Sequence, residues 1–372
     1  MKLDSFRLEH WLDEHGPRTR YDLGASTGPL WTLGELHALM TPEQTAAHEK
    51  ATVSYGPVAG REGLRRQLAE LHGVSAQEVQ VLNGGAEGLL AIFFLASEAG
   101  ANVVVPAPAF TSFTALPEAF GLEVRKYQLR EEDAYRLDVD EVRRLTDDRT
   151  KLIVVNSPNS PTGCVVEEET LRELHDFAVD RGVQFLVDEV FHPIYHDRER
   201  TSAARLPQAT ILGDFSKALC LGGLRVGWII DRDLDRLQAY RNARGYFTAS
   251  NSFPGEALAE VALEHREVFW ARAREVASRN LALLDQFFKD HADLVQWVRP
   301  RGGFTGFPRL LSGADARPLA LSAVDKGILI VPGDCFGCPS HFRLGFGACV
   351  DGYAEGLELL ATELRGAACG AG

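Results

Sequence analysis

Short apolar runs alternate with helical stretches between residues 79 and 230. The runs are rich in Val, Ile and Leu, which predicts β-strands at residues 79–83, 102–105, 151–155 and 183–187, with Pro106 ending the second. Helices are predicted between them at residues 87–97 and 167–180. Because strands that are apolar on both faces need cover on both sides, this alternation predicts a parallel sheet between layers of helices.

The C-terminal third has a different pattern. One long helical region with few breakers is predicted over residues 255–289. Strand-like pieces follow at residues 295–298, 328–331 and 342–344, mixed with helices, which indicates a second, smaller α/β domain. Ligands of open α/β sheets bind beyond the carboxyl ends of the strands. The residues that follow the strands are therefore the first candidates for a functional site.

Length and charge narrow the class of protein. The chain has 372 residues, enough for about two domains, and its content of 45% hydrophobic and 24% charged residues is typical of a globular protein in water. A net charge of −13 argues against nucleic acid or an anionic membrane as a partner. No apolar run has the length of a membrane span, and the N-terminus lacks a signal-type stretch. We therefore expect a cytoplasmic protein.

The six cysteines are scattered along the chain, so a disulfide scaffold is not expected. Cys335 and Cys338 form one C-x-x-C pair, but a zinc site needs a second pair at suitable spacing, and the sequence has none. We expect reduced thiols packed as small hydrophobic groups, and no metal site.

Two of the segments that follow strands are suited to a flat, anionic ligand. Asn-Gly-Gly-Ala-Glu-Gly at residues 83–88 lies between a strand and a helix, where backbone N–H groups bind anions, although glycines also simply close tight turns. Phe110 follows the next strand and is placed to stack on a heteroaromatic ring, although a lone Phe is more often a core residue.

Three further segments add polar chemistry. Residues 157–163, Ser-Pro-Asn-Ser-Pro-Thr-Gly, form a loop that a rigid turn alone would explain. Asp188 ends an apolar strand, where it either holds a pyridinium N–H or is a solvated strand end. Lys217 follows a strand and is placed to form a Schiff base, and Arg225 lies eight residues further on, suited to a phosphate, although most lone lysines are surface residues.

These motifs, in this order, resemble the class I/II aminotransferase family of fold-type-I enzymes that use pyridoxal 5′-phosphate (PLP), from about Tyr21 to the last helix. The resemblance implies an α/β fold with a mostly parallel seven-stranded sheet between helices and a smaller α/β domain built from both termini. It implies three segments: 1–44 and 286–372, which form the small domain, and 45–285, the large PLP-binding domain. It also implies transfer of an amino group between an L-α-amino acid and a 2-oxo acid.

The resemblance assigns a role to each site residue. Lys217 forms the internal aldimine and moves the substrate proton, Asp188 pairs with the pyridine N–H, and Phe110 stacks on the ring. Gly85, Ala86 and Glu87 offer backbone donors to the phosphate, helped by Ser216 and Arg225. Tyr55 reaches the phosphate of the neighbouring subunit, which implies a homodimer with shared active sites. Arg343 grips the α-carboxylate of the substrate, a task that suits its bidentate fork.

Three positions depart from the family pattern. Ser160 stands where an Asn donor to the ring 3-oxygen is usual, and Phe191 stands where Tyr is the second donor. Asp214 stands where Ser or Thr usually binds the phosphate. A carboxylate beside a phosphate dianion is repelled unless it points away, pairs with a cation or is protonated.

A weaker resemblance connects the chain to capreomycidine-synthase-type enzymes, which cyclise a hydroxylated arginine. It rests on the Phe at position 191 and on segments 9–12, 300–309 and 331–337. The alternative reaction is therefore β-elimination, replacement or cyclisation of a β-substituted amino acid. A non-catalytic PLP-binding regulator is disfavoured because no basic DNA-binding domain accompanies the fold.

Several other residues have two interpretations. His192 is either an acid–base group near the ring or a structural histidine, and His196 lies close to it. Three arginines are either contacts for a substrate side chain or solvated strand-end charges: Arg299, Arg301 and Arg309. Tyr21 and Trp31 belong to the N-terminal stretch that folds over the site in the family.

Overall fold

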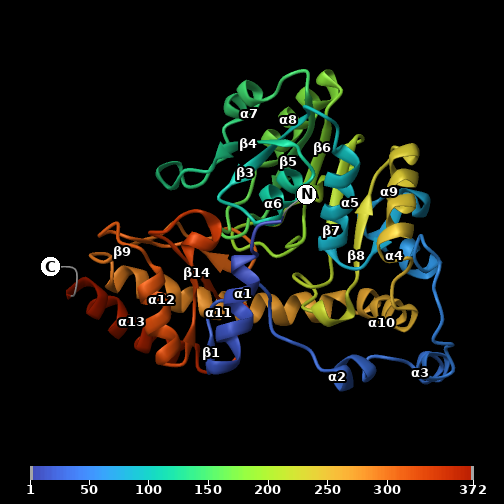
Figure 1. Ribbon diagram of the computed structural model, residues 1–372. Helices are drawn as coiled ribbons and strands as arrows, with labels where there is room; N and C mark the ends of the chain where they lie inside the picture. Colours follow the sequence, from blue (N-terminus) through green and yellow to red (C-terminus); the bar gives the residue numbers. More distant parts are fainter. Residues whose placement is uncertain (1–2, 370–372) are drawn as a thin grey trace.

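The structure, a computed structural model, describes residues 3–369 and is built on a seven-stranded sheet (Figure 1). The strand order is β2-β8-β7-β6-β5-β3-β4, and of these strands β8 alone runs antiparallel to its neighbours. The strands are β2 (Val79–Leu82), β3 (Asn102–Ala107), β4 (Glu123–Gln128), β5 (Thr150–Asn156), β6 (Gln184–Asp188), β7 (Ala209–Asp214) and β8 (Gly227–Ile230). The predicted mostly parallel sheet is confirmed.

Alternate side chains of the strands enter two separate cores. Val103 and Val105 pack with helices α5, α6 and α9 on one face, while Val104 lies in the core of the opposite face with α4, α7, α8, α10 and α11. Because both faces are buried, both sets of strand residues are apolar. These helices are α4 (Glu62–His72), α5 (Gly85–Ala96), α6 (Ser112–Ala119), α7 (Val139–Leu145), α8 (Glu168–Arg181), α9 (Leu234–Phe247), α10 (Phe253–Glu264) and α11 (Arg266–Asp290).

Two predicted boundaries were wrong. Strand β3 continues through Pro106 to Ala107, because the prolines of a strand interrupt only the ladder on their N–H side, and β3 is paired with β5 only from Asn102 to Val104. The helical region at residues 255–289 is two helices that divide at His265, whose N–H bonds to the Val261 carbonyl. No Gly or Pro marks this division, so the sequence pattern did not reveal it.

Both ends of the chain contribute to a group of short strands. β1 (Tyr21–Asp22) pairs in parallel with β12 (Ile328–Leu329), and β14 (Phe342–Gly345) lies between β10 (Thr305–Gly306) and β13 (Val331–Pro332). The remaining pair is β9 (Val295–Gln296) with β11 (Arg309–Leu310). The run predicted at 328–331 is thus divided between two sheets. The domain boundaries at 44/45 and 285/286 stay predictions.

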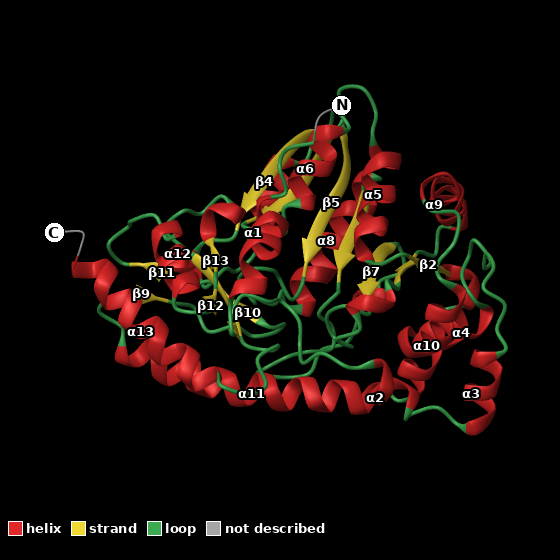
Figure 2. Ribbon diagram, turned by 60° about the horizontal axis from the view of Figure 1, so that its bottom comes forward, coloured by secondary structure: helices red, strands yellow, loops and turns green. Residues whose placement is uncertain are grey.

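Helices α12 (Arg317–Asp325) and α13 (Tyr353–Cys369) cover these short strands, and α1 (Arg7–His15) packs beside them. The long α11 runs along the molecule from α13 at one end towards α10 at the other (Figure 2). Single 3-10 turns connect the elements at Gly16–Arg18, Ala76–Glu78, Glu131–Asp133, Ala203–Arg205, Gly222–Leu224 and Gly333–Phe336.

The segment with α2 (Leu33–His37) and α3 (Pro42–Glu49) extends away from the sheet at the lower right of Figure 1. It carries exposed apolar side chains, among them Leu30, Val53 and Tyr55. Within residues 3–369, none of the helices has the length and apolar character needed to cross a membrane.

Candidate active site

A cavity of about 440 Å³ lies at the carboxyl ends of β5, β6 and β7, beside the N-terminus of α5. The register pairs Asn156 of β5 with Asp188 of β6, so the ends of these strands lie side by side. Most of the predicted site residues line this cavity: Gly85, Ala86, Phe110, Ser160, Asp188, Ser216, Lys217, Arg225 and Arg343. The fold thus brings together residues that are far apart in the sequence.

Lys217 follows β7 and lines the cavity beside the N-terminal segment. Its Nζ donates a hydrogen bond to Ser26 Oγ at 3.0 Å. Burial lowers the pKa of Lys217, and the positive charge of Arg343 acts in the same direction. A lowered pKa increases the share of the neutral amine, which is the form that attacks a carbonyl.

Asp188 ends β6 with a side chain that is only 4% exposed. Its Oδ1 accepts a hydrogen bond of 3.1 Å from the Val190 N–H. Burial, together with the charges of Asp214 and Glu189, raises the pKa of Asp188 to about 7. A cationic N–H group inside the cavity would stabilise the ionised form, so Asp188 fits the ring nitrogen of PLP.

One end of the cavity is suited to a phosphate. Gly84 has φ +83° and caps the N-terminus of α5, where free N–H groups and the helix dipole favour an anion. Arg225 lies against this turn, with Nη2 donating to the Asn83 carbonyl at 3.1 Å. The positive φ favours glycine at position 84, and a Cβ atom there would also lie 2.4 Å from Arg225 Nη2.

Asp214 enters the same end of the cavity. Its two carboxylate oxygens accept hydrogen bonds from the N–H groups of Gly85 and Ser216. Among the described residues its carboxylate forms no ion pair, so pairing with a cation, one of the three alternatives for this position, is not observed. The cavity therefore fits PLP at the ring and at Arg225. At the phosphate end, however, the N–H groups of Gly85 and Ser216 already donate to Asp214.

Arg343 lies on β14 and is 1% exposed. Its Nε and Nη2 donate to the Gly24 carbonyl at 3.1 and 2.7 Å, which fixes one edge of the guanidinium. Burial lowers the pKa of Arg343 to about 10, so it remains a cation at neutral pH. A fixed cation that borders the cavity is suited to a carboxylate ligand.

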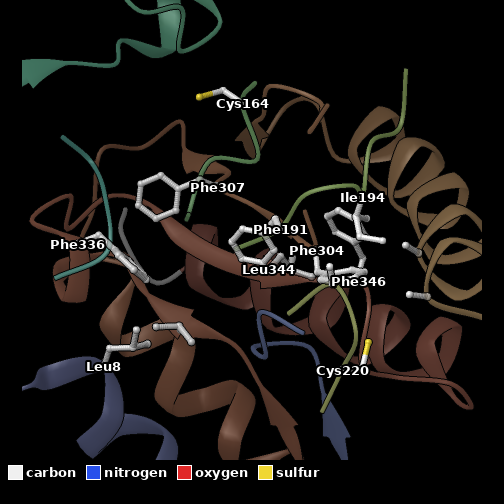
Figure 3. Close-up of a cluster of buried hydrophobic side chains, with 14 of the residues drawn as sticks. Leu8, Cys164, Phe191, Ile194, Cys220, Phe304, Phe307, Phe336, Leu344 and Phe346 are labelled. Atoms are coloured by element: carbon white, nitrogen blue, oxygen red, sulfur yellow. The ribbon is translucent and has the colours of Figure 1, made fainter. Parts of the chain in front are cut away.

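The two other departures also lie in the cavity wall. The N–H of Ser160 donates to Asn156 Oδ1 at 2.9 Å, while Asn159 is held within its own loop by Thr162. Phe191 lies among Phe304, Leu344, Ile194 and Phe346 (Figure 3). Its surroundings are apolar, so Phe is the residue that packs well there and no phenol hydroxyl faces the ligand.

Two predicted residues lie outside the cavity wall. The carboxylate of Glu87 accepts hydrogen bonds from the Asn83 N–H and Thr248 hydroxyl and pairs with Arg244, which leaves only its backbone N–H for the role predicted. Tyr55 is 87% exposed on the extended N-terminal segment. That position is compatible with a contact to a neighbouring subunit, and its role stays a prediction.

The sequence interpretation missed several residues that line the cavity, chiefly from the N-terminal segment: Leu8, Glu9, Leu12, Asp22, Ser26 and Thr27. Thr27 Oγ1 donates to the Ser216 carbonyl at 2.9 Å, which ties this segment to the lysine loop. The only sequence signal was the likeness of residues 9–12 to one enzyme branch. This N-terminal segment is far from the lysine loop in the sequence, and no motif within it marks it as part of the site.

The remaining candidates do not line the cavity. His192 contacts the Tyr195 hydroxyl at 2.9 Å, and His196 contacts the Gly303 carbonyl at 2.7 Å. Each of the three arginines pairs with an acidic residue: Arg299 with Asp285, Arg301 with Asp197 and Arg309 with Glu131. Tyr21 and Trp31 pack in or against the core. These observations favour the structural interpretations.

Comparison with known proteins gives one matching family model, "Aminotransferase class I and II", over residues 28–357. Capreomycidine synthase of Streptomyces vinaceus is 32% identical over 96% of this chain and 93% of that protein. An aspartate aminotransferase of Pyrococcus abyssi is 27% identical over 94% and 95% of the two chains. The arginine–pyruvate transaminase of Pseudomonas aeruginosa is 28% identical over 84% of each.

Solved structures show the same fold. A PLP-dependent aminotransferase from Streptococcus suis superposes with a TM-score of 0.92 at 28% identity, over 98% of both chains. The PLP-dependent cyclase OrfR gives a TM-score of 0.89 at 27% identity, over 99% of this chain and 98% of that one. Relatives with aminotransferase names and relatives with synthase or cyclase names are thus similar at comparable levels.

Proposed function

The chain belongs to the aminotransferase class I and II family of PLP-dependent enzymes, and from that premise we propose that it transfers an amino group between an L-α-amino acid and a 2-oxo acid. We propose that Lys217 is the residue that binds PLP covalently. The observation that carries the proposal is the arrangement of Lys217, Asp188 and Arg343 around one cavity. A nucleophilic amine, an acid for a ring nitrogen and a carboxylate clamp are the groups that this reaction needs.

The chain offers a contact for each part of the cofactor. Asp188 would hold the ring N–H, Phe110 would lie against the ring, and the N-terminus of α5 with Ser216 and Arg225 would hold the phosphate. When bound, PLP supplies an electron sink for the electrons released from the substrate Cα–H bond. Asp188 supports that chemistry as long as its carboxylate is ionised and the ring nitrogen keeps its proton.

The protein's own residues position the substrate and move its proton. Arg343 would bind the α-carboxylate with the edge of its guanidinium that Gly24 does not occupy. Lys217 Nζ would take the proton from Cα and return it, and Ser26 Oγ is placed to orient that amine. Fixing both ends of the substrate lowers the entropic part of the barrier.

A cationic side chain is the substrate class that the rest of the cavity favours. Leu8, Leu12 and Leu329 supply apolar wall, and Glu9 lies among them. Among the described residues, no hydrogen bond or ion pair engages the Glu9 carboxylate, whereas the Asp22 carboxylate accepts from the N–H groups of Gly24 and Ala25. An aliphatic stem that ends in a positive charge would match this surface, and one similar enzyme is named for arginine.

A second candidate function is elimination, replacement or cyclisation on a β-substituted amino acid. It is favoured by Phe191 and Ser160, which remove a phenol and an amide from the cavity, and by the likeness to capreomycidine synthase and to the cyclase OrfR. Hydroxyl and amide donors to a phenolate stabilise its charge, so their absence changes the electronics of the ring.

We also propose that the protein is a homodimer. The extended segment around α2 and α3 carries Val53, which is 88% exposed, and Tyr55, which is 87% exposed. Large apolar side chains that are exposed together mark interaction surfaces. A second copy would cover them and bring Tyr55 to the neighbouring cavity.

Product analysis tests the proposal. The holoenzyme is incubated with a panel of amino acids, with and without pyruvate or 2-oxoglutarate, and the products are followed by chromatography. Transamination predicts one turnover without a 2-oxo acid and continuous turnover with it. Continuous release of ammonia or of a cyclised product without a 2-oxo acid would replace the first candidate by the second.

A further inference from the structure

Asp214 occupies the position from which a phosphate would be bound. Its carboxylate accepts from the N–H of Gly85, the first residue of α5, and from the N–H of Ser216. A carboxylate has the charge and the acceptor geometry of an anionic ligand, and the N-terminus of a helix favours both. We call these two donors, together with Arg225, the phosphate cup.

The phosphate cup cannot serve both anions at once. Each N–H donates one strong hydrogen bond, and a dianion that approaches a carboxylate is repelled at short range. Arg225 forms no direct ion pair with Asp214 among residues 3–369, and its guanidinium donates to the Asn83 and Gly222 carbonyls instead.

The Asp214 side chain lies on the face of β7 that packs against α5. Its neighbour Gly213 is on the other face, where Trp228 packs against it, so the Asp214 carboxylate points towards the N-terminus of α5.

We infer that Asp214 competes with the cofactor phosphate for the phosphate cup, and that its carboxylate leaves the N–H groups of Gly85 and Ser216 when the phosphate binds. The inference rests on the proposed PLP site and adds a residue that sets cofactor affinity.

The test compares PLP with pyridoxal, which lacks the phosphate. Dissociation constants for both are measured on the cofactor-free full chain by quenching of tryptophan fluorescence and by absorption. Asp214→Ser is expected to tighten PLP by about tenfold or more, the range for hydrogen bonds to charged groups, and to leave pyridoxal unchanged. Asp214→Asn, which keeps the shape without the charge, is expected to fall between. Asp22→Ser, the same change elsewhere in the cavity wall, serves as the control.

Unchanged or weaker PLP binding by Asp214→Ser would overturn the inference. Failure of the proposed function is seen separately, as PLP binding without turnover of any amino acid.

Discussion

At the scale of single residues, the buried acid Asp188 links the charge of the cavity to the stability of the protein. Burial and two neighbouring acids raise its pKa to about 7, whereas an Asp in an unfolded chain has a pKa of about 4. Between about pH 4 and pH 7, the Asp188 carboxyl group keeps its proton in the folded protein and loses it in the unfolded chain. The free energy of unfolding of the cofactor-free protein therefore falls as the pH rises from about 4 to about 7.

We predict that Asp188→Asn removes this slope. The amide does not titrate, so the variant gains stability relative to the wild type as pH rises, by a few kcal/mol at most at pH 8. Urea unfolding of both cofactor-free proteins at pH 5 and pH 8 measures the difference. An equal pH dependence in the two proteins would show that Asp188 is ionised throughout.

Substitution of Arg343 tests the carboxylate clamp. Arg343→Lys keeps the charge but loses the planar fork, so KM for the amino acid is expected to rise by about 10- to 100-fold, the range for charged hydrogen bonds. Steady-state kinetics measure the change, and Arg299→Lys, on an exposed pair with Asp285, is the control. An unchanged KM would mean that the carboxylate binds elsewhere.

The proposed preference for a substrate with a cationic side chain depends on Glu9. Glu9→Gln is expected to lower kcat/KM for arginine or lysine by about tenfold and to leave a neutral amino acid such as glutamine unaffected. Glu14→Gln lies on the same helix, is exposed and does not line the cavity, so it serves as the matched control. A loss shared by charged and neutral substrates would assign Glu9 a structural role.

At the scale of elements, helix α1 is attached to the core by Trp11. The indole is 3% exposed, its Nε1 donates to the Ile330 carbonyl at 2.8 Å, and Arg317 lies 5.1 Å above the ring. Leu8, Glu9 and Leu12 of the same helix line the cavity. The position of α1 therefore links packing of the short strands to the substrate end of the site.

Trp11→Ala is expected to lower the free energy of unfolding by about 3–5 kcal/mol, as for other buried aromatic residues. Trp11→Phe keeps most of the apolar contact and loses the hydrogen bond, so it should cost about 1 kcal/mol. Denaturant melts of the two variants measure both. Equal losses would show that the hydrogen bond, rather than the packing, holds α1.

The sequence predicted the strands that have a clear hydrophobic pattern, and it did not resolve the short strands that lack one. Strands β5 and β6 are apolar on both faces, and the predicted runs match them within a residue or two. Two-residue strands such as β9 and β12 have no period, so one predicted run was divided between sheets. At the site, Lys217 after β7, Asp188 at the end of β6 and Arg343 within β14 belong to motifs and were predicted. Glu9 and Ser26 come from a distant segment and were not.

At the scale of the whole molecule, the family was predicted from the order of the motifs along the chain. It is confirmed by a family-model match that covers most of the chain.

The exposed apolar segment around Tyr55 suggests how two chains would complete two sites. Subunits with Lys217→Ala are mixed with subunits that carry Tyr55→Ala, under conditions that exchange partners. A homodimer with shared sites predicts that the mixture regains turnover through one complete site, and no recovery would argue for sites built within single chains.

The most direct test of the central claim is to locate the bound cofactor. The full chain is incubated with PLP, reduced with borohydride, digested and analysed by mass spectrometry. We predict one stoichiometric pyridoxyl adduct, on the peptide that contains Lys217, and none there in Lys217→Ala. An adduct confined to other lysines, or no adduct at saturating PLP, would contradict the assignment of this cavity as the cofactor site.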